Sequence, residues 1–366
     1  MNNNTLKEAI ELLQRLVRCK RISRHESDAS GIIGDYLAEK DVTPLTCGPN
    51  NIAVASSRDP GKPTLMLYSH VDTVKPSPAY TFNPYSGELR DGRILGIGSN
   101  DAGASLVTLL FTILALREKK LPFNLVYAVT VEEEVGGENG MRRVLPWLSE
   151  NGIKPDMVIV GEPTGMQPAV AERGLVVLDC LTHGVTGHAA RNEGVNAIYR
   201  AIDDMAALRR FKFPKVSEVL GPVKVSITQI EAGRQHNVVP DECQWVVDIR
   251  TTDAYTNEET VGLLRNALSP YTDATPRSTR VQASVLADTH PLYRAALAMG
   301  LSPFVSPTTS DMSLMHGIPS LKIGPGESSR SHTADEFVTV DELAGALDIY
   351  PKLIKQLENE FMGQGF

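Results

Sequence analysis

Cysteine is scarce in this chain, and the few cysteines lie far apart. The 366 residues include 4 cysteines and no Cys-x-x-Cys pair. A disulfide framework or a thiolate zinc site needs a recognisable pattern of cysteine spacing, so neither is predicted. We interpret the cysteines as small core residues instead. They are Cys19, Cys47, Cys180 and Cys243.

An excess of positive charge is also missing. The formal net charge is −8 at pH 7, whereas proteins that bind nucleic acid concentrate lysine and arginine to displace counterions. We therefore expect no nucleic-acid partner.

Long hydrophobic runs are absent. The longest apolar stretch, residues 106–116, is roughly half as long as a bilayer-spanning helix, which indicates a buried helix. Residues 1–13 lack the positive-then-apolar order of a signal peptide and have the pattern of a capped amphipathic helix. We expect a cytoplasmic protein that does not associate with a membrane.

Internal repeats, low-complexity segments and Gly/Ser-rich linkers are absent too, but 366 residues exceed what one hydrophobic core usually supports. Helical stretches alternate with β-rich runs in residues 1–172 and 286–366, which is typical of an α/β domain with a mixed, largely parallel sheet. Residues 173–285 have the order of a βαββαβ unit, which is the size of a small domain. We predict a split α/β domain with this second domain inserted into it.

Three of the β-rich runs end in polar clusters. Residues 64–68 precede Ser69 and His70, residues 125–130 precede three glutamates at 132–134, and residues 157–160 precede Glu162. Open α/β sheets bind ligands beyond the carboxyl ends of their strands, so we expect these clusters to converge.

His70 and Asp72 alternate along the first of these strand ends. Because residues i and i+2 of a strand face the same way, Asp72 can accept the second imidazole proton of His70 and fix the tautomer that a metal-ligating histidine needs. His-x-Asp alone is a weak signal, and a structural histidine is the alternative.

Asp101 follows the glycine-rich residues 96–98 and precedes the apolar helix. An aspartate in this place is usually a helix N-cap, which is the alternative to a ligand. The glycine-rich approach resembles a phosphate loop but lacks the Lys-Ser/Thr ending and the Rossmann spacing, so nucleotide binding is not predicted.

The remaining acidic and histidine signals each have an ordinary alternative. Glu132, Glu133 and Glu134 would repel one another unless cations neutralise them, which favours a metal site. The alternative is a solvated acidic turn. Glu162 follows an apolar strand, where burial of an unpaired carboxylate would be costly, so a partner such as a metal ion is favoured. A surface turn is the alternative. His332 follows the Gly/Ser-rich residues 324–331, which suits a ligand delivered by a loop, although a lone loop histidine is often incidental.

In this order and at these separations, the segments resemble the acetylornithine deacetylase, succinyl-diaminopimelate desuccinylase and glutamate carboxypeptidase family of dinuclear zinc amidohydrolases. The resemblance covers nearly the whole chain. It departs from many relatives after Asp101, where they have one residue and then Lys-Gly and this chain has Ala102, Gly103 and Ala104. The matching motifs are His-x-Asp-x-Val at 70–74, Gly-x-Gly-x-x-Asp at 96–101, Thr-x-acid-Glu-Glu at 130–134, Gly-Glu-Pro-Thr at 161–164 and Ser-His-Thr-Ala-Asp-Glu-Phe at 331–337.

The resemblance implies a site for two Zn²⁺ ions per subunit. Asp101 would bridge the ions, His70 and Glu162 would complete one position, and Glu134 and His332 would complete the other. Histidine and carboxylate ligands without a thiolate suit Co²⁺ as well.

The resemblance also implies the catalytic groups. Glu133 falls on the general base, which takes a proton from the attacking water and passes it to the departing amine. Asp72 supports catalysis by holding the imidazole of His70 in the orientation that metal binding needs. The register could shift by one residue, because the family accepts either acid at the position of Glu132.

The inserted domain resembles the family's lid and dimerisation domain, which implies a homodimer. His188, within residues 184–190, matches a histidine that in relatives reaches the partner subunit's active site and helps to hold the oxyanion; a turn residue is the alternative. Asn237 and Arg250 fall where relatives contact the substrate. A guanidinium can bind both oxygens of an α-carboxylate, and a surface ion pair is the alternative for Arg250.

The implied reaction is hydrolysis of the amide bond of an N-acyl amino acid. Residues 322–326 look like those of acetylornithine deacetylases and related acyl-lysine and acyl-ornithine hydrolases. We therefore predict an acylated ornithine, citrulline or lysine as substrate, and a place in arginine or lysine biosynthesis. The acyl group, acetyl or succinyl, stays open because Arg330 could pair with a distal succinyl carboxylate.

Other activities remain as alternatives. Residues 309–311 are shared with desuccinylases, so succinyl-diaminopimelate desuccinylase is the main one, followed by a dipeptidase or carboxypeptidase. A metal-free binding protein that kept the fold is the alternative from a different class.

Overall fold

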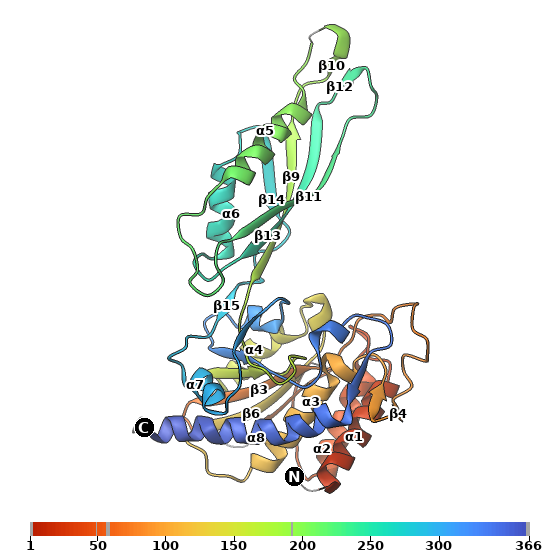
Figure 1. Ribbon diagram of the computed structural model, residues 1–366, viewed down its shortest axis with the longest axis vertical. Helices are drawn as coiled ribbons and strands as arrows, with labels where there is room; N and C mark the ends of the chain where they lie inside the picture. Colours follow the sequence, from red (N-terminus) through yellow and green to blue (C-terminus); the bar gives the residue numbers. More distant parts are fainter. Residues whose placement is uncertain (1–2, 49, 56–58, 192, 364–366) are drawn as a thin grey trace. The chain divides into compact units, whose positions relative to one another are not determined.

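The computed structural model describes residues 3–48, 50–55, 59–191 and 193–363. The chain divides into two compact units (Figure 1). Unit 1 comprises Met1–Val170, Leu286–Phe304 and Ser310–Phe366, and unit 2 comprises Ala171–Val285 and Val305–Thr309. Unit 2 thus begins two residues before the sequence-based boundary at 173. Residues 305–309 group with unit 2 rather than with the residues that flank them. β16 (Phe304–Ser306) pairs with β8 (Ala169–Glu172), the strand in which unit 2 begins, and the Thr309 hydroxyl donates to the main-chain oxygen of Arg173.

Unit 1 contains a mixed sheet whose centre is parallel. Its strands lie in the order β1-β2-β6-β3-β7-β17-β8. The central four, β6, β3, β7 and β17, are parallel to one another, whereas β1, β2 and β8 pair antiparallel with their neighbours. The predicted mixed, largely parallel sheet is confirmed. The bounds are β1 (Leu45–Cys47), β2 (Asn51–Ala55), β3 (Thr64–His70), β6 (Asn124–Thr130), β7 (Met157–Val160) and β17 (Ser320–Lys322).

Buried side chains alternate between the two faces of this sheet. On β3, Leu65 and Leu67 belong to one apolar core, whereas Met66 and Tyr68 belong to another on the opposite face. The first core is shared with α1 (Asn3–Arg18), α2 (Ser27–Glu39), α3 (Ala104–Leu116), α7 (Pro291–Ala298) and α8 (Val340–Gly363), and the second with α4 (Met141–Glu150) and the short helix η4 (Asp311–Leu314). A strand covered on both faces reads as a continuous apolar run, which is the pattern of β3.

The apolar run at residues 106–116 forms most of α3. The segment Ser99–Leu116 is long and apolar enough to cross a membrane, but 83% of it is buried inside the protein. It is a core helix of unit 1, packed against α1 and α8.

A small antiparallel sheet joins two segments that are far apart in the chain. Its order is β18-β5-β4, with β4 (Glu88–Arg90), β5 (Arg93–Leu95) and β18 (Phe337–Thr339). Phe337 pairs with Leu95. This pairing brings two segments together. One leads from the end of β5 to Asp101, and the other carries His332 and ends at the start of β18.

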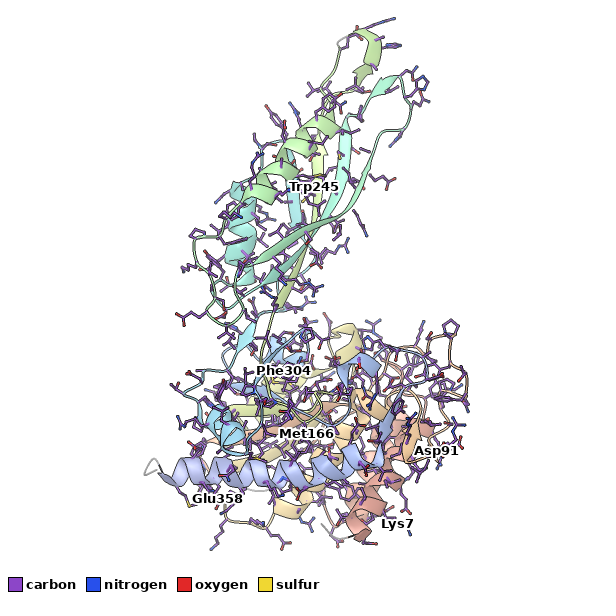
Figure 2. All side chains as sticks on the ribbon, in the orientation of Figure 1. Lys7, Asp91, Met166, Trp245, Phe304 and Glu358 are labelled. Atoms are coloured by element: carbon purple, nitrogen blue, oxygen red, sulfur yellow. The ribbon has the colours of Figure 1, made fainter. Side chains whose placement is uncertain are left out.

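Unit 2 has the βαββαβ order expected from the sequence. Its antiparallel sheet has the order β11-β13-β9-β14, and α5 and α6 share a core with one face of it. Trp245, which is fully buried, belongs to this core (Figure 2), and its indole N–H donates to Thr182 Oγ1 at 3.0 Å. The bounds are β9 (Gly174–His183), α5 (Ala197–Arg210), β11 (Lys224–Ala232), β13 (Glu242–Thr251), α6 (Asn257–Asn266) and β14 (Thr272–Pro276).

Beyond the ends of β9 and β13, the chain forms a two-stranded ribbon. β10 (Gly187–His188) pairs with β12 (Val238–Val239), and Figure 1 shows this ribbon at one end of unit 2. The last short strand of the unit, β15 (Ser284–Val285), pairs with Ala171 and Glu172 of β8.

Candidate metal centre and active site

Three neighbouring parallel strands end at the same edge of the unit 1 sheet. β3 lies between β6 and β7, and the register pairs His70 with Thr130 and Tyr68 with Val160. The glutamates after β6 and Glu162 after β7 therefore lie at the edge where His70 ends β3, as expected for the ligand-binding edge of an open α/β sheet.

His70 is buried and faces carboxylates on both sides of its ring. Nε2 lies 3.3 Å from Asp101 Oδ1 and 3.5 Å from Glu162 Oε1. Nδ1 lies 3.1 Å from the main-chain oxygen of Asp72 and 3.4 Å from its carboxylate Oδ1. The carbonyl of Asp72 is thus closer to the ring than its carboxylate, and both acceptors favour a proton on Nδ1, which leaves Nε2 as the ligand atom.

Asp101 does not cap α3. Its backbone is extended, with φ −112° and ψ 104°, inside the short turn η1 (Ser99–Gly103), and the residue before α3 is Gly103. The carboxylate instead lies between two histidines: Oδ1 faces His70, and Oδ2 lies 3.7 Å from Nε2 of His332.

His332 comes from a loop between η5 (Ser328–Arg330) and β18. Its Nε2 lies 2.8 Å from Glu134 Oε2. The five predicted ligands thus form two groups that share Asp101, namely His70, Asp101 and Glu162, and Asp101, Glu134 and His332; within each group the candidate ligand atoms lie within 4.8 Å of one another.

The three consecutive glutamates have different surroundings. Glu132 is buried and accepts hydrogen bonds from the side chain of Asn139 at 2.8 Å and from its main-chain N–H at 3.2 Å. Glu134 contacts His332. Glu133 is half-buried, and burial together with the charge of nearby Asp311 raises its pKa well above the usual range. The three acids thus differ in their partners and in their burial.

Asp72 connects the end of β3 to the turn after β6. Its carboxylate accepts the hydroxyl of Ser23 at 2.7 Å and the main-chain N–H groups of Glu133 at 3.1 Å and Glu134 at 3.2 Å. Burial by itself would raise the pKa of Asp72, but these bonds and the contact with His70 outweigh burial and lower it. Asp72 therefore positions both His70 and the glutamate turn.

The histidines hold their protons strongly in this ring of acids. Burial by itself would lower the pKa of His70, but the carboxylates of Glu162, Asp101 and Asp72 outweigh it and raise the pKa well above the usual value. A hydrogen bond to Glu134 raises the pKa of His332 to about 9. Burial raises the pKa of Glu162 to about 8. These shifts share one cause, an excess of negative charge at the site, which bound cations would also compensate.

The donor set fits two divalent cations. Glu162 Oε1 is buried and has no hydrogen-bond partner within the described part of the chain. Imidazole nitrogens and carboxylate oxygens without a thiolate are ligands for zinc and related ions. The residues present can hold two such ions, with Asp101 between them.

Several buried polar residues around the site were not recognised from the sequence. The Tyr68 hydroxyl contacts Asp311 and lies 2.9 Å from Thr130 Oγ1, so an acid from η4 lies behind the strand ends. Lys322 is 2% exposed and its charge acts on Glu162. Lys322 lies between the apolar residues Leu321 and Ile323, a sequence pattern that indicates a buried cation. The contact of Asp311 with Tyr68 cannot be predicted from the neighbouring sequence.

The residues predicted to contact substrate from unit 2 form two separate sets. His188 lies in β10, and the N–H of Ala189 donates to the main-chain oxygen of Asn237 at 3.0 Å, so His188 and Asn237 are neighbours on the β10–β12 ribbon. Arg250 lies near the other end of β13, where its guanidinium binds the Asp248 carboxylate at 2.8 and 3.2 Å. Arg250 lies eight residues beyond Glu242, which corresponds to about 27 Å of extended strand.

Arg330 is already paired within unit 1. Its Nη1 donates to both carboxylate oxygens of Glu342, at 2.9 and 2.8 Å, and its guanidinium lies 4.4 Å from the centre of the Phe337 ring. The structure brings Arg330 to the base of the His332 loop as a structural ion pair.

The chain is similar in sequence to known proteins over most of its length. The family model described as peptidase family M20/M25/M40 matches residues 66–356. Succinyl-diaminopimelate desuccinylase 2 of Ruegeria sp. (strain TM1040) is 26% identical over 263 residues, covering 68% of this chain and 67% of that protein. The succinyl-diaminopimelate desuccinylase of Ehrlichia canis (strain Jake) is 24% identical over 377 residues, covering 96% of this chain and 99% of that protein.

Solved structures share the fold over almost the whole chain. Aminopeptidase PepT from Bacillus cereus ATCC 10987 has a TM-score of 0.76 at 21% identity, with 96% of this chain and 98% of that chain covered. The Bacillus subtilis YXEP protein, described as a dinuclear metal-binding peptidase, has a TM-score of 0.71 at 15% identity, with the same shares covered.

Proposed function

The chain belongs to peptidase family M20/M25/M40, and we propose that this metallohydrolase uses two metal ions to remove the acyl group from an N-acyl amino acid. The observation that carries the proposal is the Asp101 carboxylate, which presents one oxygen to His70 and the other to His332. A carboxylate placed in this way is suited to bridge two cations.

We assign one ion to His70, Asp101 and Glu162 and the other to Asp101, Glu134 and His332. The ligand types support Zn²⁺, with Co²⁺ as a substitute. Bound ions would polarise the scissile carbonyl and lower the pKa of a water between them.

In this proposal Glu133 is the general base. It lies beside the ligands without belonging to either group, and Asn139 holds the neighbouring Glu132 away from this role. Its raised pKa suits a group that takes a proton from the attacking water and then gives it to the leaving amine. Asp72 holds the backbone of Glu133 and Glu134 and thereby sets the direction of both side chains.

For the substrate we propose an acylated ornithine, citrulline or lysine, in arginine or lysine biosynthesis. The loop at residues 322–326 supports this choice. The ion pair of Arg330 with Glu342 removes one reason to expect a distal succinyl carboxylate. Succinyl-diaminopimelate is the second candidate, favoured by the names of the relatives from Ruegeria sp. and Ehrlichia canis.

We further propose a homodimer in which the unit 2 residues of two chains complete each active site. About 27 Å of strand separates the ribbon with His188 and Asn237 from Arg250, which is more than a single acyl amino acid can span. If all three touch one substrate, they come from two copies. Exposed apolar side chains support an interface on unit 2, namely Tyr199 and Ile202 of α5 and Ile227 and Ile230 of the edge strand β11. We propose a cytoplasmic enzyme with no nucleic-acid or membrane partner.

Removal and return of metal test the proposed chemistry. Chelated protein should lose hydrolysis of N-acetyl- and N-succinyl-ornithine, -citrulline and -lysine, and Zn²⁺ or Co²⁺ should restore it at two ions per chain, counted by elemental analysis. Full hydrolysis by protein shown to be metal-free would overturn the proposal.

A further inference from the structure

We propose that Asn100 is a positioning residue that ties the His332 loop to Asp101 and so controls occupancy of the metal position formed by Asp101, Glu134 and His332. The inference rests on the ligand assignment proposed above. It concerns a residue that precedes one ligand in the chain and contacts the loop that carries another.

The amide of Asn100 is fully buried and uses both of its ends. Oδ1 accepts the main-chain N–H of Glu327 at 2.9 Å, and Nδ2 donates to the main-chain oxygen of Glu327 at 3.1 Å and to Ser331 Oγ at 3.4 Å. These bonds hold both ends of residues 327–331, directly before His332. An aspartate would lose the donors and an aliphatic residue would lose all three bonds, so the position requires an amide.

A glycine allows the loop to come this close. Gly326 has φ +83°, and a Cβ at this position would lie 2.1 Å from Asn100 Oδ1. Any larger residue would push the start of the loop away from the amide. Asn100 and Gly326 therefore fit each other, although 226 positions separate them in the sequence.

The other side of the same turn is fixed by the segment after His332. Glu336, which is buried, accepts the main-chain N–H of Asn100 at 3.0 Å and of Asp101 at 2.9 Å through Oε1. Asp101 is thus held to the His332 segment both before and after the histidine. Loss of the amide removes the contact before it and leaves the one after it.

The other metal position is supported by the sheet and by the start of the loop, where the main-chain oxygens of Gly324 and Gly326 accept N–H groups of residues 164–166. His70 ends the buried strand β3, and Glu162 follows the buried strand β7, which is paired with β3. Within the described part of the chain, the Asn100 amide bonds to Glu327 and Ser331 and to neither of these two ligands. A change at Asn100 should therefore separate the two positions, weakening one ion and sparing the other.

The test is a stepwise titration of metal-free protein with Zn²⁺ in a calorimeter, with bound metal counted by elemental analysis. The wild type should bind two ions per chain. Asn100→Ala and Asn100→Asp should retain one ion near wild-type affinity and bind the second about 10–100-fold more weakly, the usual cost of losing a residue that orients a ligand. His332→Ala sets the expected pattern for loss of that position.

Two further variants separate positioning from general destabilisation. Gly326→Ala leaves the amide intact but displaces the start of the loop. Because the Gly326 oxygen also accepts the main-chain N–H of Gly165, three residues after Glu162, this variant should weaken both ions and serves as the non-selective comparison. Asn257→Asp is the matched control, because Asn257 is a fully buried asparagine of unit 2 whose amide donates to the main-chain oxygens of Thr279 and Val281. It should bind both ions as the wild type does.

The outcomes are distinguishable. If the wild type does not bind two ions, the proposed function fails. If the wild type binds two ions, the inference is overturned when the Asn100 variants bind both normally, or when they lose both ions equally.

Discussion

Arg21 lies inside unit 1 with 1% of its surface exposed, and its Nη2 donates to the main-chain oxygen of Gly98 at 2.6 Å. Nη1 donates to the main-chain oxygen of Val71 at 2.6 Å. One guanidinium therefore links the segment of His70 and Asp72 to the turn that carries Asp101. Gly98 leaves room for it, since a Cβ there would lie 2.4 Å from Arg21 Nη2.

Arg21→Met should lower the free energy of unfolding of the metal-free protein by about 3 kcal/mol, because it removes two charge-assisted hydrogen bonds from a buried place. Urea unfolding in the presence of a chelator measures the change. Lys20→Met is the matched control, since Lys20 is exposed in the same segment, and it should stay within about 0.5 kcal/mol of the wild type. Equal midpoints for the two variants would contradict this role of Arg21.

Glu133→Gln should keep the metal and lose turnover. The substitution preserves the shape and leaves the five proposed ligands unchanged, so kcat should fall by about two to four orders of magnitude, the range for loss of a general acid or base. Elemental analysis and steady-state kinetics on the same sample measure both effects. Glu132→Gln is the comparison and should keep most of the turnover, because Asn139 binds that carboxylate. Loss of metal from Glu133→Gln would show that Glu133 is a ligand.

Complementation between inactive subunits should show whether His188 acts across a dimer. His188→Ala and Glu133→Gln homodimers should each be almost inactive. After subunit exchange at equal concentrations, half of the dimers are mixed and one site in each has both groups, so about a quarter of the sites should recover. Tagged subunits verify the exchange. A mixture as inactive as its parents would place the action of His188 within its own chain, or would exclude it.

Competition between substrates should favour acyl-ornithine, acyl-citrulline or acyl-lysine over succinyl-diaminopimelate in kcat/KM. Acetyl and succinyl forms should be compared for each amino acid. Arg250→Lys should lower kcat/KM about tenfold for these substrates by removing a bidentate carboxylate contact, and should change little for analogues with an amidated α-carboxyl group. A higher kcat/KM for succinyl-diaminopimelate than for every other substrate would reverse the assignment and leave the metal chemistry untouched.

The strand ends of the site could be predicted because they follow from local pattern and sheet geometry. His70, the glutamates at 132–134 and Glu162 each follow an apolar run, and parallel neighbours end at one edge. Asp101 and His332 were found by their motifs, and their contact depends on the pairing of β18 with β5, which no local pattern announces.

The supporting residues could not be predicted, because their contacts join distant segments. Arg21, Asn100 and Glu336 bind mainly main-chain N–H and C=O groups. Almost every residue carries these groups, so they leave no signature in the sequence. Arg250 is different, because its partner Asp248 lies two residues earlier on the same strand. Residues i and i+2 of a strand face the same way, so this ion pair is predictable from the sequence. The role of Arg250 with substrate stays a prediction.

The long separation of His332 from the other ligands has a consequence for how the enzyme matures. During synthesis His70, Asp101, Glu134 and Glu162 leave the ribosome well before His332, and all of unit 2 is made in between. Contacts of such high sequence separation require loop closure before they can form, which makes them slow. We expect a nascent chain to acquire its first ion early and its second only after the C-terminal segment has docked, so that full metal loading marks a completed molecule.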